Sequence, residues 1–556
     1  MKTRILALFL AVSGFSADFY VTPNGVGNGS QASPANFTQA CVAGVVPAGS
    51  TVWLKGGTYL GPFINRMAGN ANARITVRPM PGERAIFDSR HPTTTPPLGI
   101  IWDAPIFTID TQGGGYVDYV DLEIKWSYAQ RPPSGSMRDR ARPTGIDLHA
   151  PNCRIINCLL YDVGNAIGVW EQAPGSLVYG NVVINQGWQD APAGEGSPPG
   201  QGGTGHGVYG QSKFGSLTLR HNIQRGGYGY GFHFYTDGSE VWNITSDGNV
   251  SIEPGGHSTG WNYKPAFFIG GGNGVKNANF VHNWAFVPLP AEGFNYQMWW
   301  GSKMNVNLLF DNNVSIGSKN GWGIENYGDL KFRHNRVYCA QRPTRLANIQ
   351  VAAFDDNDYF GAEYFRFNGA VLTYPQWASS VPDPNGSFSR FSPSGSWVEV
   401  FANEFEVGRA NIVVGNFQNF PSVEVEIPGL QSGDNFVLRN VADWFNPVSS
   451  GSYSGKLLIP LGNRTSSPIG ESRVIPAQNM VNAFVVRKVG TNVVVIPIPI
   501  PTPTNIPPGT VTVTNVVWQT NVSTIWQTNV MWQTNSVTVG VTNTLGFRPD
   551  GTLYLK

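Results

Sequence analysis

The chain has 556 residues, of which 13% are charged, and its formal net charge is +1 at pH 7. Soluble domains usually contain about 25% charged residues, and coiled coils or charge-driven disordered chains need still more. With 67 glycines, 40 prolines and 12% aromatic residues, the composition indicates a large all-β protein rich in loops. The balanced charge provides no basic field for nucleic acid, so no nucleic-acid partner is expected.

The N-terminal residues 1–17 have the three parts of a secretory signal peptide. Two basic residues precede an apolar run at 5–12, and small residues follow up to Ala17. The apolar run is shorter than the roughly 20 residues that cross a bilayer. We therefore expect a secreted or cell-surface protein without a membrane span, the alternative being that this run is a buried first strand.

The middle of the chain repeats one pattern, in which an apolar strand ends in Asn and a second strand follows a short turn. The Asn-ending strands close at Asn157, Asn181, Asn222, Asn249, Asn283, Asn313 and Asn335. Such a repeat is typical of a solenoid, whose coils stack and share one core. A β-sandwich has similar turn spacing. However, the recurrent corner Asn, which tolerates left-handed backbone and can bond its stacked neighbour, favours a right-handed parallel β-helix.

Two parts of the sequence resemble known families. Phe19–Val21 with Gly49–Tyr59 is similar to the first coil of pectate-lyase-like proteins, an opening shared with the chondroitinase B and alginate lyase family. Gly205–Gln211 and Tyr230–Tyr235 resemble a large group of secreted bacterial β-helix proteins. The resemblance covers about residues 18–488 and implies the parallel β-helix fold.

Composition divides the chain into six segments. They are a signal peptide at 1–17, a parallel β-helix at 18–345, an irregular connector at 346–396, a small β-sandwich at 397–489, a Pro-rich linker at 490–509 and a tail at 510–556. The tail has three copies of Trp-Gln-Thr-Asn, and its Val and Thr content favours a β-rich module for assembly or surface attachment. A short coiled coil and a disordered tail are the alternatives.

Four cysteines do not form a disulfide framework, and both stacked free thiols and a bridge are compatible with their spacing. No Cys/His spacing resembles a zinc site. The cluster Asp355–Asp358 is a candidate for calcium, with a solvated acidic turn as the alternative. No other cofactor is expected.

Strand alternation predicts which side chains leave the core. If Ile146, Ile167, Val208 and Phe232 point inward, the residues that follow them point outward. The first outward row is then Asp147, Gly168, Tyr209, His233, Phe268, Gln297 and Glu325. The second outward row is His149, Trp170, Gln211, Tyr235, Gly270, Trp299 and Tyr327. Aromatic faces stack on sugar rings and planar polar groups bond hydroxyls, so this face is predicted to bind polysaccharide, unless loops cover it as extra core.

Long insertions flank the coils at 207–211 and 231–235. One lies at 187–205, and the other lies between 235 and 266 and contains Lys264. Because long insertions beside minimal coils are more often functional than structural, the site is expected between them. Tyr209 and His233 are the predicted catalytic centre, with His206 and Lys264 as further catalytic candidates. The substrate-binding candidates are Asp147, His149, Trp170, Gln211, Tyr235, Trp299, Glu325 and Tyr327.

The candidate residues fit a lyase better than a hydrolase. The triplet around His206 resembles the polygalacturonase family, but the accompanying Asn-Thr-Asp and Arg-Ile-Lys motifs of that family are absent. A lyase needs a base and a cation beside the uronate carboxylate. Tyr209 or His233 would be the base, and Lys264 or the arginines at 138, 140 and 142 would meet the anion. The hypothesis is a polysaccharide lyase, and the alternatives are a glycoside hydrolase and a non-catalytic glycan-binding or adhesive protein.

Overall fold

The structure is a computed structural model. It describes residues 18–89, 105–110, 115–128, 142–189, 203–213, 215–236, 240–258, 263–288, 293–381, 383–462 and 480–490, with short pieces at 464–466, 468–469, 475–476, 545–547 and 553–555. The chain forms two compact units, residues 1–498 and 499–556. The predicted signal peptide and most of the tail lie outside the described residues. No helix in the described part is long and apolar enough to cross a membrane.

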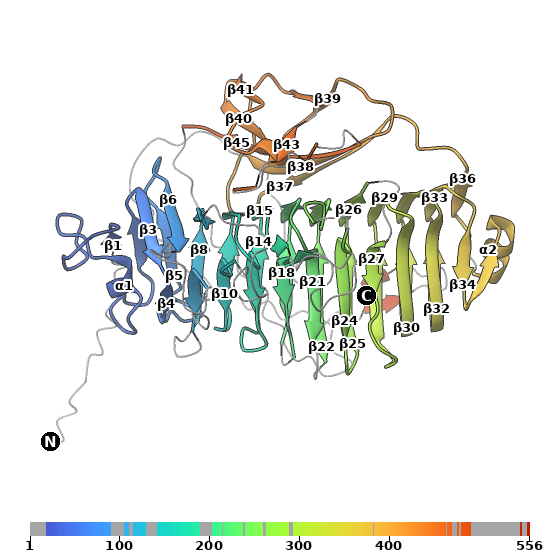
Figure 1. Ribbon diagram of the computed structural model, residues 1–556, viewed down its shortest axis with the longest axis horizontal. Helices are drawn as coiled ribbons and strands as arrows, with labels where there is room; N and C mark the ends of the chain where they lie inside the picture. The colour runs from blue at the N-terminus through green and yellow to red at the C-terminus, as the bar shows by residue number, and fades with distance from the viewer. Residues whose placement is uncertain are drawn as a thin grey trace. The chain divides into compact units, whose positions relative to one another are not determined.

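The first unit contains a parallel β-helix in which successive coils stack along one axis (Figure 1). Within the described residues, the parallel pairings form three faces, which we name sheets I, II and III. Sheet I consists of β4 (Phe63–Asn65), β7 (Phe107–Ile109), β10 (Ile146–Leu148), β13 (Ile167–Val169), β18 (His206–Gly210), β21 (Tyr230–Thr236), β24 (Phe267–Gly271), β27 (Phe294–Met298), the first halves of β30 (Asn320–Arg333) and β32 (Arg342–Asp355), and β34 (Phe365–Phe367).

The other two sheets follow in each coil. Sheet II consists of β1 (Asp18–Val21), β2 (Thr51–Leu54), β5 (Ile75–Pro79), β8 (Val117–Val120), β11 (Arg154–Ile156), β14 (Ser176–Tyr179), β19 (Leu217–Arg220), β22 (Val241–Asp247), β25 (Val275–Val281), β28 (Val306–Asp311) and the second halves of β30 and β32. Sheet III consists of β3 (Gly57–Gly61), β6 (Ala85–Ser89), β9 (Glu123–Lys125), β12 (Leu159–Tyr161), β15 (Val182–Ile184), β20 (Ile223–Arg225), β23 (Val250–Ile252), β26 (Trp284–Val287), β29 (Val314–Gly317), β31 (Arg336–Cys339), β33 (Asp358–Gly361) and β36 (Ser387–Ser389).

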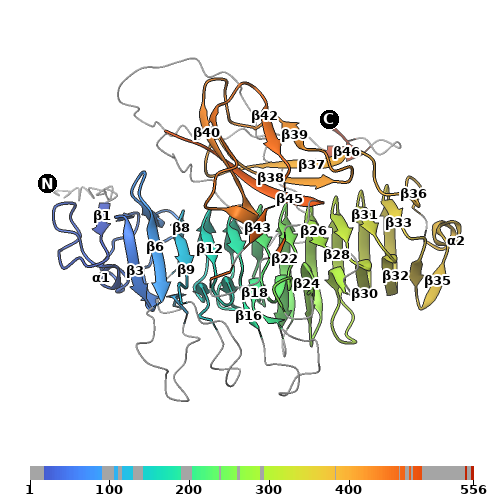
Figure 2. The ribbon, with the colours of Figure 1, turned by 45° about the horizontal axis from the view of Figure 1, so that its top comes forward.

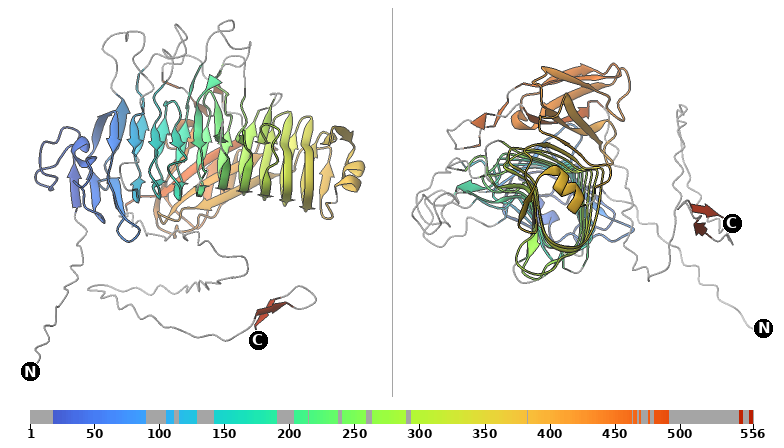
Figure 3. Two further views of the ribbon diagram at one scale, coloured as in Figure 1. Left: turned by 90° about the horizontal axis from the view of Figure 1, so that it is seen from below. Right: turned by 90° about the vertical axis from the view of Figure 1, so that its right-hand side faces the viewer.

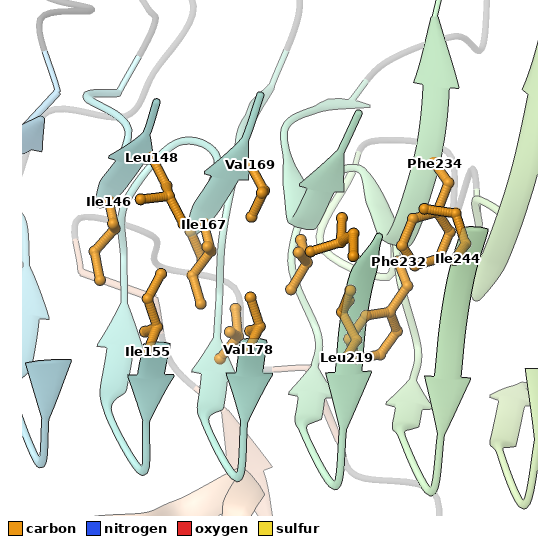
Figure 4. Packing of buried hydrophobic residues seen from close by; sticks show 14 of the residues in the cluster. Ile146, Leu148, Ile155, Ile167, Val169, Val178, Leu219, Phe232, Phe234 and Ile244 are labelled. Carbon is orange, nitrogen blue, oxygen red and sulfur yellow. The ribbon is translucent and has the colours of Figure 1, made fainter. Parts of the chain in front are cut away.

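The core is made by side chains that point inward from the same position of successive coils. Ile146, Ile167, Val208 and Phe232 are paired in register and at most 1% exposed, as the strand alternation predicts. Figure 4 shows Ile146, Ile167 and Phe232 among the packed side chains. All four cysteines are buried and free. The right-handed parallel β-helix predicted from the repeat is therefore confirmed.

A ladder of Asn side chains runs between sheets II and III. Each ladder Asn donates from its Nδ2 to a backbone carbonyl of the preceding coil and to the next Asn, except that the last member, Asn357, donates to Asp383 Oδ2. The members are Asn181, Asn222, Asn249, Asn283, Asn313, Asn335 and Asn357, with Nδ2 to Oδ1 distances between successive members of 2.8–3.3 Å. Six of the seven predicted positions are confirmed.

The prediction for Asn157 is wrong, because Cys158 occupies the ladder position in that coil and its N–H donates to Asn181 Oδ1 at 2.8 Å. Asn157 instead takes the left-handed corner, with φ of 57°. The left-handed residue thus comes just before the ladder residue, as it also does at His221 and His282.

The coils extend further than the sequence pattern suggested. Part of the segment 346–396, expected to be irregular, continues the helix through β32, β33, β34 and β36. The antiparallel partner of β34, β35 (Ala370–Leu372), and α2 (Tyr374–Ser380) follow the last coils, and Trp377 of α2 is fully buried against Phe365. At the other end, α1 (Phe37–Ala40) places Phe37 against Phe63 and Phe87. Both ends of the solenoid core are thus covered by aromatic side chains.

A β-sandwich follows the helix and packs on sheet III (Figures 2 and 3). One antiparallel sheet contains β37 (Ser396–Ala402), β38 (Arg409–Asn416), β45 (Val481–Lys488), β40 (Asn435–Asn440) and β41 (Ser449–Ser452). The smaller antiparallel pairs here are β39 (Ser422–Val425) with β42 (Leu457–Pro460), and β43 (Thr465–Ser466) with β44 (Ile475–Pro476). A further antiparallel pair, β16 (Trp188–Gln189) with β17 (Gly203–Thr204), belongs to the helix. Val413 and Val485 of the sandwich share a buried cluster with Val182 and Ile223 of sheet III. The second unit shows one hairpin, β46 (Leu545–Phe547) with β47 (Leu553–Leu555).

Removal of a ladder side chain should destabilise the helix. In Asn283→Ala, the Nδ2 bonds to Ser246 O and Asn313 Oδ1 are lost, and the N–H of Asn249 loses its acceptor. The expected loss in free energy of unfolding is about 2–4 kcal/mol, because buried partners are left unsatisfied. Chemical denaturation would measure it. The exposed Asn385→Ala should lose less than about 0.5 kcal/mol, and equal losses in the two variants would contradict the role of the ladder.

Candidate functional site

The outward face of sheet I carries most of the candidate residues. Register pairs Asp147 with Gly168, Gly168 with Tyr209, and Tyr209 with His233, and the row continues to Phe268 and Gln297. This much of the predicted first row is confirmed. Stacked strands lie about 4.8 Å apart, so consecutive members of the row are neighbours.

The last coil of the predicted rows is wrong by two residues. Gln297 pairs with Gly323 rather than Glu325. The Trp299 ring covers Gly323, where a Cβ would lie 2.2 Å from that ring. Glu325 therefore falls in the second row, where its carboxylate pairs with Arg345 at 2.6 Å.

Tyr327 does not face the outer surface. Its side chain is fully buried in the helix core, where β30 passes from sheet I to sheet II. The prediction that Tyr327 contacts substrate is therefore wrong. The sequence signal failed because β30 is one strand of 14 residues that serves both sheets, so the alternation was counted across a bend.

His233 is enclosed by other rings. Its centroid lies 4.4–5.5 Å from the rings of Phe268, Tyr230, His206, Tyr235 and Tyr209. The residue is 7% exposed, and neither ring nitrogen has a hydrogen-bond partner among the described residues. Burial, with a smaller contribution from His206, holds the pKa of His233 well below its usual value. His233 therefore points outward from the sheet as predicted, but the surrounding rings cover it.

His206 is the imidazole that a neighbouring amide holds in one tautomer. Its Nδ1 lies 2.8 Å from Asn165 Oδ1. Because the amide oxygen only accepts, Nδ1 carries the proton and Nε2 keeps a lone pair. Burial lowers the pKa of His206 to about 3, so the ring is neutral at ordinary pH although the residue is only half-buried.

Tyr209 and Lys264 lie beside His206. The Tyr209 ring is 5.1 Å from that of His206, and its hydroxyl donates to Tyr235 O at 3.0 Å. Gln211 Nε2 donates to the same hydroxyl oxygen at 3.2 Å. Lys264 Nζ lies 5.8 Å from the ring centroid of Tyr230, which stacks on His206 at 5.4 Å. Three of the four predicted catalytic residues thus surround one surface, with His233 beneath them.

A second polar group lies on the neighbouring coils. Asp147 Oδ2 is 2.8 Å from His149 Nε2, and Trp170 Nε1 donates to Asp147 Oδ1. Gly168 leaves room for this bond, because a Cβ there would lie 2.9 Å from Asp147 Oδ1. The carboxylate of Asp147 raises the pKa of His149. Trp170 also stacks on His149 at 5.7 Å and lies 5.5 Å from Tyr209, which joins both groups into one surface.

We name this surface the aromatic band. Its side chains follow one another across the coils of sheet I, with His149 at one end and Trp300 at the other. Sequence reasoning missed three of its residues. They are Asn165, Tyr230 and Trp300. Trp300 meets Tyr235 at 6.1 Å and is 48% exposed, whereas the predicted Trp299 stacks with Arg345 at 5.2 Å. The extended strand ends at Met298, so alternation does not carry through to residue 300 and could not have identified it.

The predicted arginine loop is not confirmed as an anion site. Arg142 is 2% exposed and donates to the backbone oxygens of Asp162 and Trp126. Its guanidinium therefore supports the fold. Positions 138 and 140 lie outside the described residues. In the described part of the chain, no group of three His, Cys, Asp or Glu side chains could hold a metal ion, and Asn357 of the calcium candidate belongs to the Asn ladder.

No protein-family model and no curated protein sequence matches the chain. Among solved structures, pectate lyase Pel9A is similar over 60% of this chain and 78% of its own, with 17% identity and a TM-score of 0.37. An alginate lyase from Paenibacillus sp. str. FPU-7 is similar over 64% and 96%, with 16% identity and a TM-score of 0.31. The likeness concerns the fold, which the strand register establishes independently.

Buried imidazoles should make the protein sensitive to acid. The folded pKa of His233 is lowered, so below the unfolded value of about 6.5 the unfolded chain binds the additional proton and stability falls as pH decreases. Between pH 6 and pH 5, the free energy of unfolding of His233→Phe should fall by about 1 kcal/mol less than that of the unchanged protein. Stability at pH 8 should rise by about 1–3 kcal/mol, because two buried unsatisfied nitrogens are removed.

Denaturant unfolding at each pH measures both effects. His334→Asn is the matched control, since that imidazole is exposed and Asn accepts its left-handed backbone. An unchanged pH dependence in His233→Phe would contradict this account of His233.

Proposed function

We propose that this protein is a secreted or cell-surface polysaccharide lyase that binds its glycan along the aromatic band of sheet I. The observation that supports this most is the neutral His206 beside Tyr209, with Lys264 over the adjoining Tyr230. A base, a hydroxyl and a cation are the groups that β-elimination beside a carboxylate requires. The half-exposed rings of the band suit the faces of sugar rings.

Each group has a defined part in the proposed reaction. Nε2 of His206 removes the proton from the sugar carbon next to the carboxylate, and the ammonium of Lys264 stabilises the negative charge that develops on that carboxylate. The C–H electrons form a carbon–carbon double bond as the glycosidic C–O bond breaks. The Tyr209 hydroxyl gives its proton to the leaving oxygen, and water then carries the proton that His206 took up back to Tyr209, which resets both residues. His206 takes the role of base that the sequence had assigned to His233 or Tyr209.

A hydrolase finds less support on this face. A pair of carboxyl groups about 5–10 Å apart would be needed. Asp147 is bonded to His149 and Trp170, and Glu325 pairs with Arg345. Neither faces a second carboxylate in register, since their partners are Thr108 and Gly168 for Asp147, and Ala347 for Glu325. Asp110 of the preceding coil also acts on His149, but its carboxylate pairs with Arg66 at 3.0 Å. The pairing of these carboxylates supports elimination more than hydrolysis.

The second candidate is a non-catalytic glycan-binding or adhesive protein. The unbroken row of rings from His149 to Trp300 supports binding without reference to any reaction. Binding alone would not need His206 to keep a lone pair or Tyr209 to hold a proton. These two roles therefore separate the candidates.

A panel of uronate-containing and neutral polysaccharides tests the proposal. Unsaturated ends, which absorb ultraviolet light, should form with at least one uronate polymer, together with one reducing end for each. Reducing ends without unsaturation would identify a hydrolase. Binding with neither signal would identify the non-catalytic alternative.

Site variants test the assigned roles. His206→Ala and Tyr209→Phe should each lower kcat by about 10²–10⁴-fold, because each removes a proton-transfer group. Trp170→Ala should mainly raise KM, since its ring is placed for binding. His334→Asn and Tyr364→Phe, which lie away from the band, are matched controls that should keep full activity. Unchanged kcat in His206→Ala would contradict the assignment of the base.

A further inference from the structure

A second candidate site lies where the β-sandwich meets sheets II and III. A cavity of about 910 Å³ opens there between the early coils and the sandwich strands. We name it the junction cavity. Its walls include Arg78 and Arg84 from the helix and Arg439, Trp444 and Phe445 from the sandwich. A smaller hollow of about 230 Å³ also includes Arg439 and Trp444 and extends toward the sandwich sheet.

The lining of the junction cavity is basic. Six Arg and Lys side chains face three Asp and Glu side chains. Several of these charges are paired. Arg487 lies 2.8 Å from Asp121, and Arg84 lies 2.7 Å from Glu123. The first pair joins the sandwich to the helix, and the second lies within the wall that the helix forms. The lining as a whole still has more basic than acidic side chains.

Arg78 and Arg439 contribute two of these positive charges. Neither forms an ion pair with any residue that the structure describes, whereas Arg439 donates to Trp444 O at 2.7 Å. The Nε of Arg78 is buried without a hydrogen-bond partner in the described residues. Burial lowers the pKa of both guanidinium groups, and nearby Arg84 lowers that of Arg439 further. The carboxylates of Asp121 and Glu406 act on Arg78 from a distance, but no carboxylate bonds either guanidinium directly among the described residues. A partly desolvated cation of this kind is costly unless an anion joins it.

Aromatic side chains stand next to these cations. The Arg78 guanidinium lies 5.5 Å from the Trp53 ring, and that of Arg439 lies 5.9 Å from the Trp444 ring. Phe445 is 52% exposed and lies 6.0 Å from Arg84. Ring faces beside forked donors suit a ligand that is itself a ring bearing an anionic group. An inorganic anion would use the arginines but would have no ring of its own to pack against the aromatic side chains.

We propose that the junction cavity binds an anionic sugar, with the carboxylate or sulfate group on Arg78 and Arg439 and the sugar ring against Trp53, Trp444 or Phe445. This site is formed by other sheets than the aromatic band and does not depend on the proposed lyase activity. It would hold an acidic glycan by a second point of attachment. The shared chemistry is an anionic oxygen group on a pyranose ring, which uronates and sulfated sugars both supply.

Calorimetric titration of the full chain tests the proposal. The probes are a trigalacturonate, a sulfated oligosaccharide of similar length, a neutral oligosaccharide and inorganic sulfate. One or both acidic sugars should bind, more weakly at higher salt, and the neutral sugar should not bind in the cavity. In Arg78→Gln/Arg439→Gln, the affinity of the cavity should fall about tenfold or more. Arg390→Gln, an exposed arginine at the far end of the helix, is the charge-matched control.

Hydrogen exchange locates the binding. Protection on adding the acidic sugar should appear at residues 76–84 and 436–445, should vanish in the double variant and should persist in Trp170→Ala. Protection confined to sheet I would overturn the junction site and leave the lyase proposal standing. Equal binding of inorganic sulfate and acidic sugar, or no binding of either acidic sugar, would also overturn it. If the double variant unfolds early, Arg78→Gln alone decides, because Arg78 has no ion pair to lose.

Discussion

The stacking of parallel coils in register is the constraint on which everything else in this protein depends. It repeats each inward position at about 4.8 Å, so that Ile146, Ile167, Val208 and Phe232 form one continuous core. The Asn ladder fixes that register from within by bonding each coil to the next. The same register places outward residues of distant sequence side by side. Tyr209 and His233 become neighbours in this way, without any local motif.

The periodic part of the structure could be predicted from sequence, and the errors arose where periodicity ends. Alternation identified the row from Asp147 to Gln297, and recurrence identified six ladder positions. Asn157 was misplaced because a pattern of corner residues does not distinguish the ladder residue from the left-handed residue before it. Tyr327 was misplaced because β30 bends between two sheets within a single strand.

The direction of a side chain could be predicted, but not what covers it. His233 points outward as expected, and five surrounding rings bury it. Alternation placed Phe268 next to His233, but it did not include Tyr230, nor could it show that the rings close over the imidazole. The consequence is chemical, since the neutral imidazole with a directed lone pair is His206, oriented by Asn165. The low proportion of charged residues supports the assignment of His206 as the base, because this face has few other titratable groups that could take that role.

The most direct test of the account is a crystal structure of the Tyr209→Phe variant with a bound oligouronide. We expect sugar rings stacked along the aromatic band over Trp170, with one carboxylate next to Lys264 and the neighbouring ring carbon facing His206 Nε2. An oligouronide absent from sheet I, or bound there with its carboxylates directed away from Lys264 and His206, would contradict it.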